Sequence, residues 1–155
     1  MIAEPFPPVA DVLPHRGPMV LLSRILEHSD QHTVCAVDIR ADAPFVEPAG
    51  TVPAWIGLEY MAQCVAAHAG LRARARGEPV RTGFLVGSRR IDVHTTGFRV
   101  GQRLTVVATH TWGEQEAAAF ACQLLDGDSG TVLLEGTLSV FRPRTLDRLL
   151  EGAPE

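Results

Sequence analysis

Cysteines are few in this sequence and long apolar runs are missing, and both absences restrict the kind of protein it encodes. The chain contains only Cys35, Cys64 and Cys122, far apart and without a CxxC pair. An odd number of scattered cysteines argues against a disulfide framework and against a cysteine-rich zinc site. No apolar run approaches the ~20 residues of a membrane span, and the N-terminus does not resemble a signal peptide. We therefore expect a cytoplasmic protein with no membrane span.

A large net charge and the common hydrolase and nucleotide-binding motifs are also absent. The formal net charge is -4, so the chain as a whole offers no electrostatic attraction for nucleic acid. It contains no GxSxG, P-loop or GxGxxG sequence, which are signatures of serine hydrolases and nucleotide-binding folds. The histidines show no metal-ligand spacing. The sequence thus predicts no nucleic-acid partner and no metal site.

The 155 residues fit one domain, 1–155, because no linker or internal repeat divides the chain. A long apolar helix is predicted over about residues 53–76, with Thr51 as its N-cap, Pro53 in its first turn and Gly77 at its end. Alternating or β-branched residues predict strands at 18–26, 33–39, 84–94, 103–112, 117–125 and 132–141.

The predicted helix is apolar almost all round, so other elements must cover it. An α+β fold, with an antiparallel sheet of about six strands wrapped around this central helix, covers it most economically. The alternative is a helix packed flat on one face of a sheet whose other face is buried in a dimer.

Two polar side chains, Glu59 and Gln63, interrupt the apolar helix four residues apart, so they share one face and can touch. A carboxyl group that faces an apolar pocket stays protonated near neutral pH and serves as a general acid. The alternative is that Glu59 lies on a solvent-exposed side of the helix. His68 is nine residues from Glu59, which places it on the opposite face. We therefore interpret His68 as a packed core histidine.

Three stretches resemble the FabA/FabZ family of 3-hydroxyacyl-ACP dehydratases. Residues 13–24, LPHRGPMVLLSR, resemble the family segment LPHRxPxLLxDR. Residues 53–63, PAWIGLEYMAQ, resemble the start of the family helix, PGxLxxExMAQ. A weaker similarity, at 83–87 and 100–104, is to a strand and a VxPGDxL turn. The stretches follow the family order, and the later strands fit the remainder of its fold.

This resemblance implies a hotdog fold, a dimer, and an acyl substrate carried on the phosphopantetheine of an acyl carrier protein (ACP), with no cofactor bound by the chain itself. In the family, a histidine removes the proton next to the thioester. A carboxyl acid from the other subunit then protonates the departing hydroxyl group. Glu59 matches that acid. Ala54, where the family has glycine, Trp55 and Gln63 match the substrate-binding helix start, whose N–H groups bind the thioester oxygen.

The family histidine precedes the helix in a GHFPxxP segment, and the corresponding segment here, residues 44–53, has no histidine. This combination resembles the ApeP-like branch, found in aryl polyene biosynthesis, whose members pair with a second hotdog dehydratase. A partner subunit would then supply the base opposite Glu59. His15 is the alternative base, although we interpret it first as structural, because FabZ-type proteins carry the same histidine beside their catalytic one.

Three functions remain open. The first is dehydration of a 3-hydroxyacyl-ACP in fatty acid or aryl polyene biosynthesis, as a homodimer or as half of a heterodimer. The second is a hotdog thioesterase, in which the helix carboxylate acts on the thioester. The third is a non-catalytic stabilising subunit of a dehydratase pair. Five arginines are candidates either for docking the acidic ACP or for a solvated rim: Arg81, Arg89, Arg90, Arg99 and Arg103.

Overall fold

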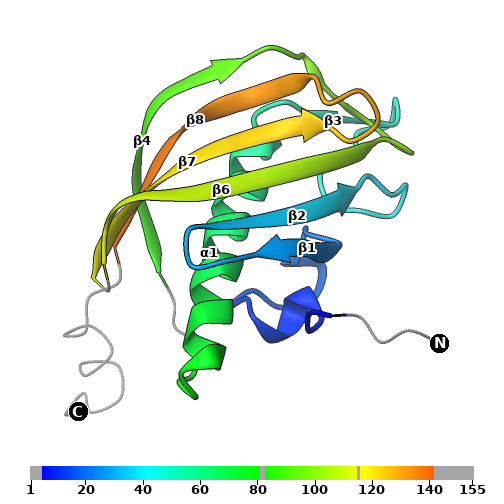
Figure 1. The fold of residues 1–155 in the computed structure, drawn as a ribbon. Helices are drawn as coiled ribbons and strands as arrows, with labels where there is room; N and C mark the ends of the chain where they lie inside the picture. Colours follow the sequence, from blue (N-terminus) through cyan, green and yellow to red (C-terminus); the bar gives the residue numbers. More distant parts are fainter. Residues whose placement is uncertain (1–4, 81–82, 115, 142–155) are drawn as a thin grey trace, which may run out of the picture.

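One long helix and one curved antiparallel sheet form most of the protein, and Figure 1 shows the sheet curving over the helix. The computed structural model describes residues 5–80, 83–114 and 116–141. The elements in chain order are η1 (Val9–Asp11), η2 (Gly17–Met19), β1 (Arg24–His28), β2 (His32–Asp38), β3 (Thr51–Pro53), α1 (Ile56–Ala75), β4 (Phe84–Val93), β5 (Gly97–Arg99), β6 (Arg103–Gly113), β7 (Ala117–Asp126) and β8 (Val132–Phe141).

The main sheet has the strand order β1-β2-β6-β7-β8-β4, and every neighbouring pair is antiparallel. Strands β6, β7 and β8 follow one another through short turns, as the sequence predicts. Strand β4 precedes them in the chain but pairs with β8, so it forms the far edge of the sheet. A separate two-stranded ladder of β3 and β5 was not predicted from the sequence.

The core lies between the concave face of the sheet and α1. Buried side chains alternate along the strands, as at Leu104, Val106 and Ala108 of β6, so every second residue points at the helix. Met61 and Cys64 of α1 are fully buried against this face. The predicted α+β fold, with a sheet around a central helix, is confirmed, and a helix packed flat on a sheet is not observed.

The predicted start of the helix is wrong by three residues. Thr51 and Pro53 belong to β3, where they pair with Arg99 and Gly97, so neither caps nor begins α1. The N-cap residue is Trp55, whose side chain makes no capping hydrogen bond. Pairing with β5 satisfies the backbone of β3 and buries Val52, a tertiary gain that overrides the local helix signals.

The C-terminal end of α1 lies close to the prediction. Arg76 is its C-cap residue, and Gly77 follows in the left-handed conformation with φ of 70°. The N–H of Glu78 donates to the carbonyl oxygen of Ala73, 2.9 Å away, which closes the last turn. Within the described part of the chain, no helix is both long and apolar enough to cross a membrane.

The strand predicted over residues 18–26 begins only at Arg24. Residues 17–19 form the 3-10 turn η2, and the backbone N–H of Leu21 donates to the side chain of Gln63 on α1, 2.9 Å away. A helix side chain therefore takes the hydrogen bond that a strand neighbour would have accepted.

A close crossing holds the N-terminal segment against α1. The segment beside η1 passes over Gly70, where any Cβ would overlap the carbonyl oxygen of Val12. Val12 and Leu13 are buried at this crossing. Figure 1 shows the segment (blue) beside the helix, below β1. Since His15 follows within two residues of Leu13, this crossing determines where His15 lies.

Candidate active site

The structure brings together Glu59 and His15, the two residues that the sequence indicates as catalytic candidates. Glu59 lies in the first turn of α1, and His15 lies between η1 and η2. His15 Nε2 is 3.5 Å from Glu59 Oε1, and the two side chains are 26% and 38% exposed. Glu59 is therefore neither fully buried nor fully solvated, and it has a histidine beside it within its own chain.

Among the described residues, only one ring nitrogen of His15 has a polar neighbour, through the 3.5 Å approach of Nε2 to Glu59 Oε1. Its Nδ1 is buried and has no hydrogen-bond partner among the described residues. Catalytic histidines usually have this second nitrogen bonded to a carbonyl or carboxylate group, which fixes the tautomer and orients the ring. The described part of the chain does not by itself prepare His15 as a general base.

Gln63 ties Glu59 to the N-terminal segment. It is fully buried, and its Nε2 donates to Glu59 Oε1 at 3.0 Å and to the carbonyl oxygen of Met19 at 2.7 Å. Its Oε1 accepts from the N–H of Leu21. The contact between Glu59 and Gln63 predicted from their spacing is thus present. Both amide hydrogens are used within the chain, so Gln63 orients the carboxyl group of Glu59.

Replacing Gln63 by methionine should lower the free energy of unfolding by about 1–3 kcal/mol. The side chain keeps its length, but the backbone groups of Met19 and Leu21 lose a buried partner. Urea unfolding of the variant measures this loss. Gln123→Met, on the exposed outer face of β7, is the matched control and should change stability by less than about 0.5 kcal/mol. Equal losses in both variants would contradict the assigned role.

An elongated groove of about 430 Å³ begins beside Glu59 and His15. It follows α1 from Glu59 to Arg76, about 25 Å along the helix axis at 1.5 Å per residue. Ala62, Ala66 and Ala69 give its middle part an apolar wall. Its far end is charged, with Arg72, Arg76, Glu114 and Glu116. Its length and its apolar middle part suit an acyl chain with its reactive end at Glu59.

The start of α1 offers backbone N–H donors near Glu59. The N–H groups of Gly57 and Leu58 already donate to the carbonyl oxygens of Ala54 and Trp55, 2.9 Å and 3.2 Å away, so the donors left at this end of α1 are the N–H groups that precede Gly57. Trp55 is 68% exposed and packs edge-to-face on Phe45, with ring centroids 6.4 Å apart. Ala54 lies one residue before it and is half-buried.

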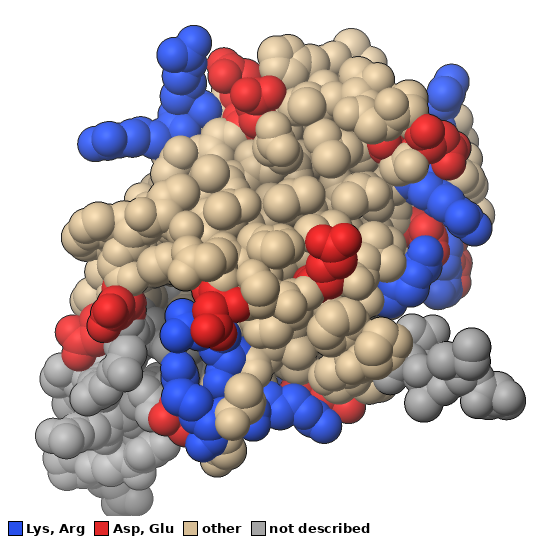
Figure 2. Space-filling view, in the orientation of Figure 1, with Lys and Arg blue, Asp and Glu red and all other residues tan. Residues whose placement is uncertain are grey.

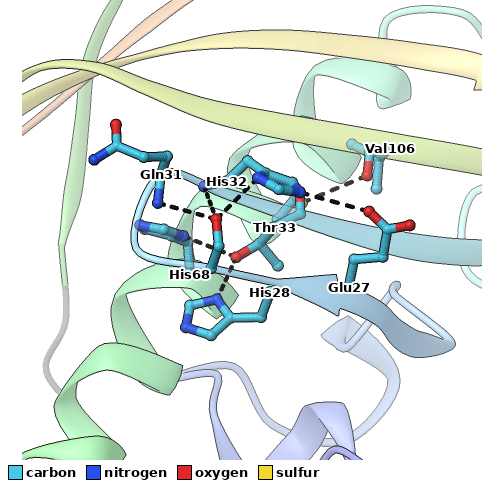
Figure 3. A network of polar contacts seen from close by, with 9 residues as sticks. Glu27, His28, Gln31, His32, Thr33, His68 and Val106 are labelled. Atoms are coloured by element: carbon cyan, nitrogen blue, oxygen red, sulfur yellow. Dashed lines mark hydrogen bonds and ion pairs between the residues drawn. The ribbon is translucent and has the colours of Figure 1, made fainter.

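A second polar cluster lies deeper in the core, around His68 (Figure 3). His68 is 2% exposed, which confirms the prediction of a core histidine. Thr33 Oγ1 is 2.8 Å from the Nδ1 atoms of both His68 and His28. Burial lowers the pKa of His68 to about 4, and the nearby charges of His28 and Arg72 lower it further. The imidazole of His68 is therefore neutral at pH 7.

His68 should make the protein less stable in mild acid. The unfolded chain binds a proton at His68 near pH 6.5, whereas the folded chain does so only near pH 4. Stability due to this residue is complete above pH 6.5 and falls by about 3 kcal/mol as the pH drops to 4. Urea unfolding of wild type and His68→Phe at several pH values measures this component, which the variant lacks. The control His94→Gln, at an exposed site, should retain the pH-dependent loss of stability. The prediction would be contradicted if the free energy of unfolding of wild type and of His68→Phe fell equally with pH.

The four candidate arginines that the structure describes do not form one continuous surface. Arg89 and Arg90 are exposed on β4, at one edge of the sheet. Arg99 lies on β5, and Arg103 begins β6, which β7 and β8 separate from β4. Figure 2 likewise shows the basic side chains at the margins of the face in view and none at its centre. Arg81 lies outside the described residues.

Comparison with known families and structures gives consistent results. The family model described as ApeP-like, ApeP dehydratase, matches residues 7–151. The structure titled dehydratase heterocomplex ApeI:P from Xenorhabdus doucetiae contains a chain of 28% identity and TM-score 0.86, aligned over 96% of this chain and 99% of that one. Curated protein sequences gave no match.

More distant structures share the fold alone. TT0310 protein from Thermus thermophilus is 18% identical, with a TM-score of 0.61, over 83% of this chain and 100% of that one. A hypothetical thioesterase from Streptococcus pneumoniae, solved with coenzyme A, is 12% identical, with a TM-score of 0.60, over 77% and 84%. Together with the observed sheet and helix, the structural matches confirm the hotdog fold.

Proposed function

Since the chain belongs to the ApeP-like dehydratase family, we propose that it takes part in dehydrating 3-hydroxyacyl groups carried by an ACP. We propose further that it does so as one subunit of a dehydratase formed with a second hotdog protein. The observation that carries the proposal is the carboxyl group of Glu59, oriented by Gln63 at the end of a long, partly apolar groove.

The reaction requires an acid and a base on two different parts of the substrate. The base removes a proton from the carbon next to the thioester, the C–O bond at the next carbon breaks, and the acid gives its proton to the departing hydroxyl. The products are water and an enoyl thioester. Glu59 is the proposed acid, and the N–H groups at the start of α1 are the proposed donors to the thioester oxygen.

The base is proposed to come from the partner subunit rather than from His15. The acid and base must stand on either side of the substrate, yet His15 Nε2 and Glu59 Oε1 are only 3.5 Å apart. No substrate atom fits between groups in such contact. His15 is therefore proposed to orient Glu59, together with Gln63. The similarity to a chain of a dehydratase heterocomplex supports a hotdog partner.

The test is an assay of the purified chain on a 3-hydroxyacyl-ACP, alone and mixed with a second hotdog dehydratase, with mass spectrometry of the carrier-bound product. We expect the enoyl product only from the mixture. Release of free thiol without enoyl product would show a thioesterase instead. The proposal would be contradicted if neither sample gave enoyl product when several different hotdog dehydratases were tried as the partner.

Replacing His15 distinguishes an orienting residue from a base. His15→Gln keeps an N–H near the position of Nε2, so it should retain most of the activity, whereas His15→Ala should lower kcat roughly tenfold. If His15 is the base, both variants should lose more than about 10²-fold. The rates of the reconstituted enzyme give the answer, and equal, large losses would contradict the orienting role.

A purely stabilising role is the second candidate, because the segment before the helix, residues 44–53, lacks a histidine. In that case the heterocomplex would keep full activity without the carboxyl group of Glu59. Mutation of the partner's own site would then abolish turnover. Measurements on both subunits of one complex separate the two roles.

A further inference from the structure

His68 has one nitrogen that the proposed chemistry does not use. His68 is one of the residues that line the groove, and its side chain is only 2% exposed. Nδ1 bonds with Thr33, whereas Nε2 is buried and has no hydrogen-bond partner within the described residues. In Figure 3, one ring nitrogen of His68 meets Thr33 and the other points away from it. Leaving a buried polar atom unpaired is costly, so a partner for Nε2 is expected in the working protein.

Thr33 links the two histidines, so that the ring nitrogen carrying the hydrogen in His28 decides which one carries it in His68. The Thr33 hydroxyl has a single hydrogen, so it donates to one histidine and accepts from the other. Burial lowers the pKa of both histidines, so each neutral ring carries one N–H. When His28 donates to Thr33, His68 carries its hydrogen on Nε2. In the reverse arrangement Nε2 is a bare acceptor, so His68 can present either a donor or an acceptor.

The position of His68 defines which part of a ligand it can meet. It lies nine residues after Glu59, about 13 Å along the helix axis. Between them, the groove wall is formed by Ala62, Val65 and Ala66, which offer no polar side-chain atoms. A chain that starts at Glu59 thus crosses an apolar stretch before it reaches His68.

We propose that His68 is a specificity-determining residue, which hydrogen-bonds through Nε2 to a hydroxyl or carbonyl oxygen far along the acyl chain. The groove would then favour long acyl chains with a polar group at that depth over plain hydrocarbon chains. This inference rests on the proposed function, because it takes the groove to be the acyl site. Nε2 is buried, so this contact requires neighbouring side chains to shift as the acyl chain fills the groove.

Non-reactive acyl-pantetheine amides of one length provide the test. A series carries one hydroxyl group at successive positions along the chain, and the reference carries none. Isothermal titration calorimetry with the complex of this chain and its hotdog partner measures each dissociation constant, with the partner alone titrated as the control. The hydroxyl at the depth of His68 should bind about three- to tenfold more tightly than the same hydroxyl in the apolar stretch, the size of one net hydrogen bond.

Two substitutions distinguish the roles of the two ring nitrogens of His68. Asparagine places its amide near the position of Nδ1, and glutamine places it near that of Nε2. His68→Asn should therefore keep the bond with Thr33 and lose the three- to tenfold preference. His68→Gln should lose the bond with Thr33 and keep part of the preference. Affinity for the reference amide should change equally in both variants.

Nitrogen-15 NMR of the wild-type imidazoles gives a second readout that needs no substitution. The matching hydroxyl probe should shift the His68 Nε2 resonance, and the His28 resonances should change with it through Thr33. An unshifted Nε2 resonance at saturation, or a preference that survives in His68→Asn, would overturn the assignment of His68. Failure of every amide to bind would instead overturn the groove as the acyl site, and with it the inference.

Discussion

Dehydration by the reconstituted enzyme is expected to fall by about 10²–10⁴-fold when Glu59 is replaced by glutamine, the usual contribution of a positioned general acid. Glutamine matches glutamate in size, and its amide oxygen can still accept the hydrogen bond from Gln63. It has no acidic proton to give to the departing hydroxyl. The loss should therefore appear in kcat, with KM nearly unchanged, when enoyl-ACP formation is followed over time.

A second glutamate beside a histidine provides a matched control. Glu27 Oε2 is 3.5 Å from His32 Nε2, the same separation as in the candidate site, but Glu27 is 66% exposed and does not line the groove. Glu27→Gln should leave the rate within about twofold of wild type, because exposed ion pairs contribute little. Full activity of the Glu59→Gln complex would remove Glu59 from the chemistry and favour a stabilising subunit.

Gly70→Ala should destabilise the fold, although glycine-to-alanine changes inside helices usually stabilise by about 0.5–1 kcal/mol. The added methyl group would overlap the carbonyl oxygen of Val12, and backbone atoms cannot rotate away as side chains do. The helix and the buried segment at Val12 and Leu13 would have to separate. We expect a loss of about 1–3 kcal/mol or more, and a Tm lower by about 2–4 °C per kcal/mol.

Gly57→Ala, in the same helix, is the control for Gly70→Ala. Its added methyl group would lie 2.9 Å from Leu134 Cδ2, 3.0 Å from Leu124 Cδ2 and 3.2 Å from Phe98 Cζ, all of them side-chain atoms, whereas at Gly70 it would meet backbone. The cost should therefore be smaller at Gly57 than at Gly70. Because His15 follows the crossing at Gly70, Gly70→Ala should also lower the dehydration rate. A raised Tm for Gly70→Ala would contradict the close crossing.

Local patterns predicted the long strands well. The strand expected at 103–112 is Arg103–Gly113, and the one expected at 132–141 is Val132–Phe141. Alternating burial and turn glycines are visible in consecutive residues, so these strands need no knowledge of distant contacts. The three-residue strands β3 and β5 carry no such alternation. They exist because Thr51–Pro53 and Gly97–Arg99 meet in space.

In the candidate site, too, contacts within one element were predicted from the sequence and contacts between distant segments were not. The spacing of Glu59 and Gln63 on one helix predicted their contact, because positions four apart share a helix face. The motif around them indicated which carboxyl group to consider. The sequence did not predict that Gln63 would also bind Met19 and Leu21, since those hydrogen bonds join segments more than 40 residues apart.

The sequence alone determined that one long apolar helix carries Glu59 and Gln63, that strands follow it, and that the segment before it has no histidine. These features depend on residue type and on spacing within a single element. Only the tertiary structure decided that His15 lies 3.5 Å from Glu59 and that His68 is one of the residues that line the groove. The physical reason is that both depend on how separate elements pack, at the crossing of Val12 over Gly70 and between α1 and the sheet.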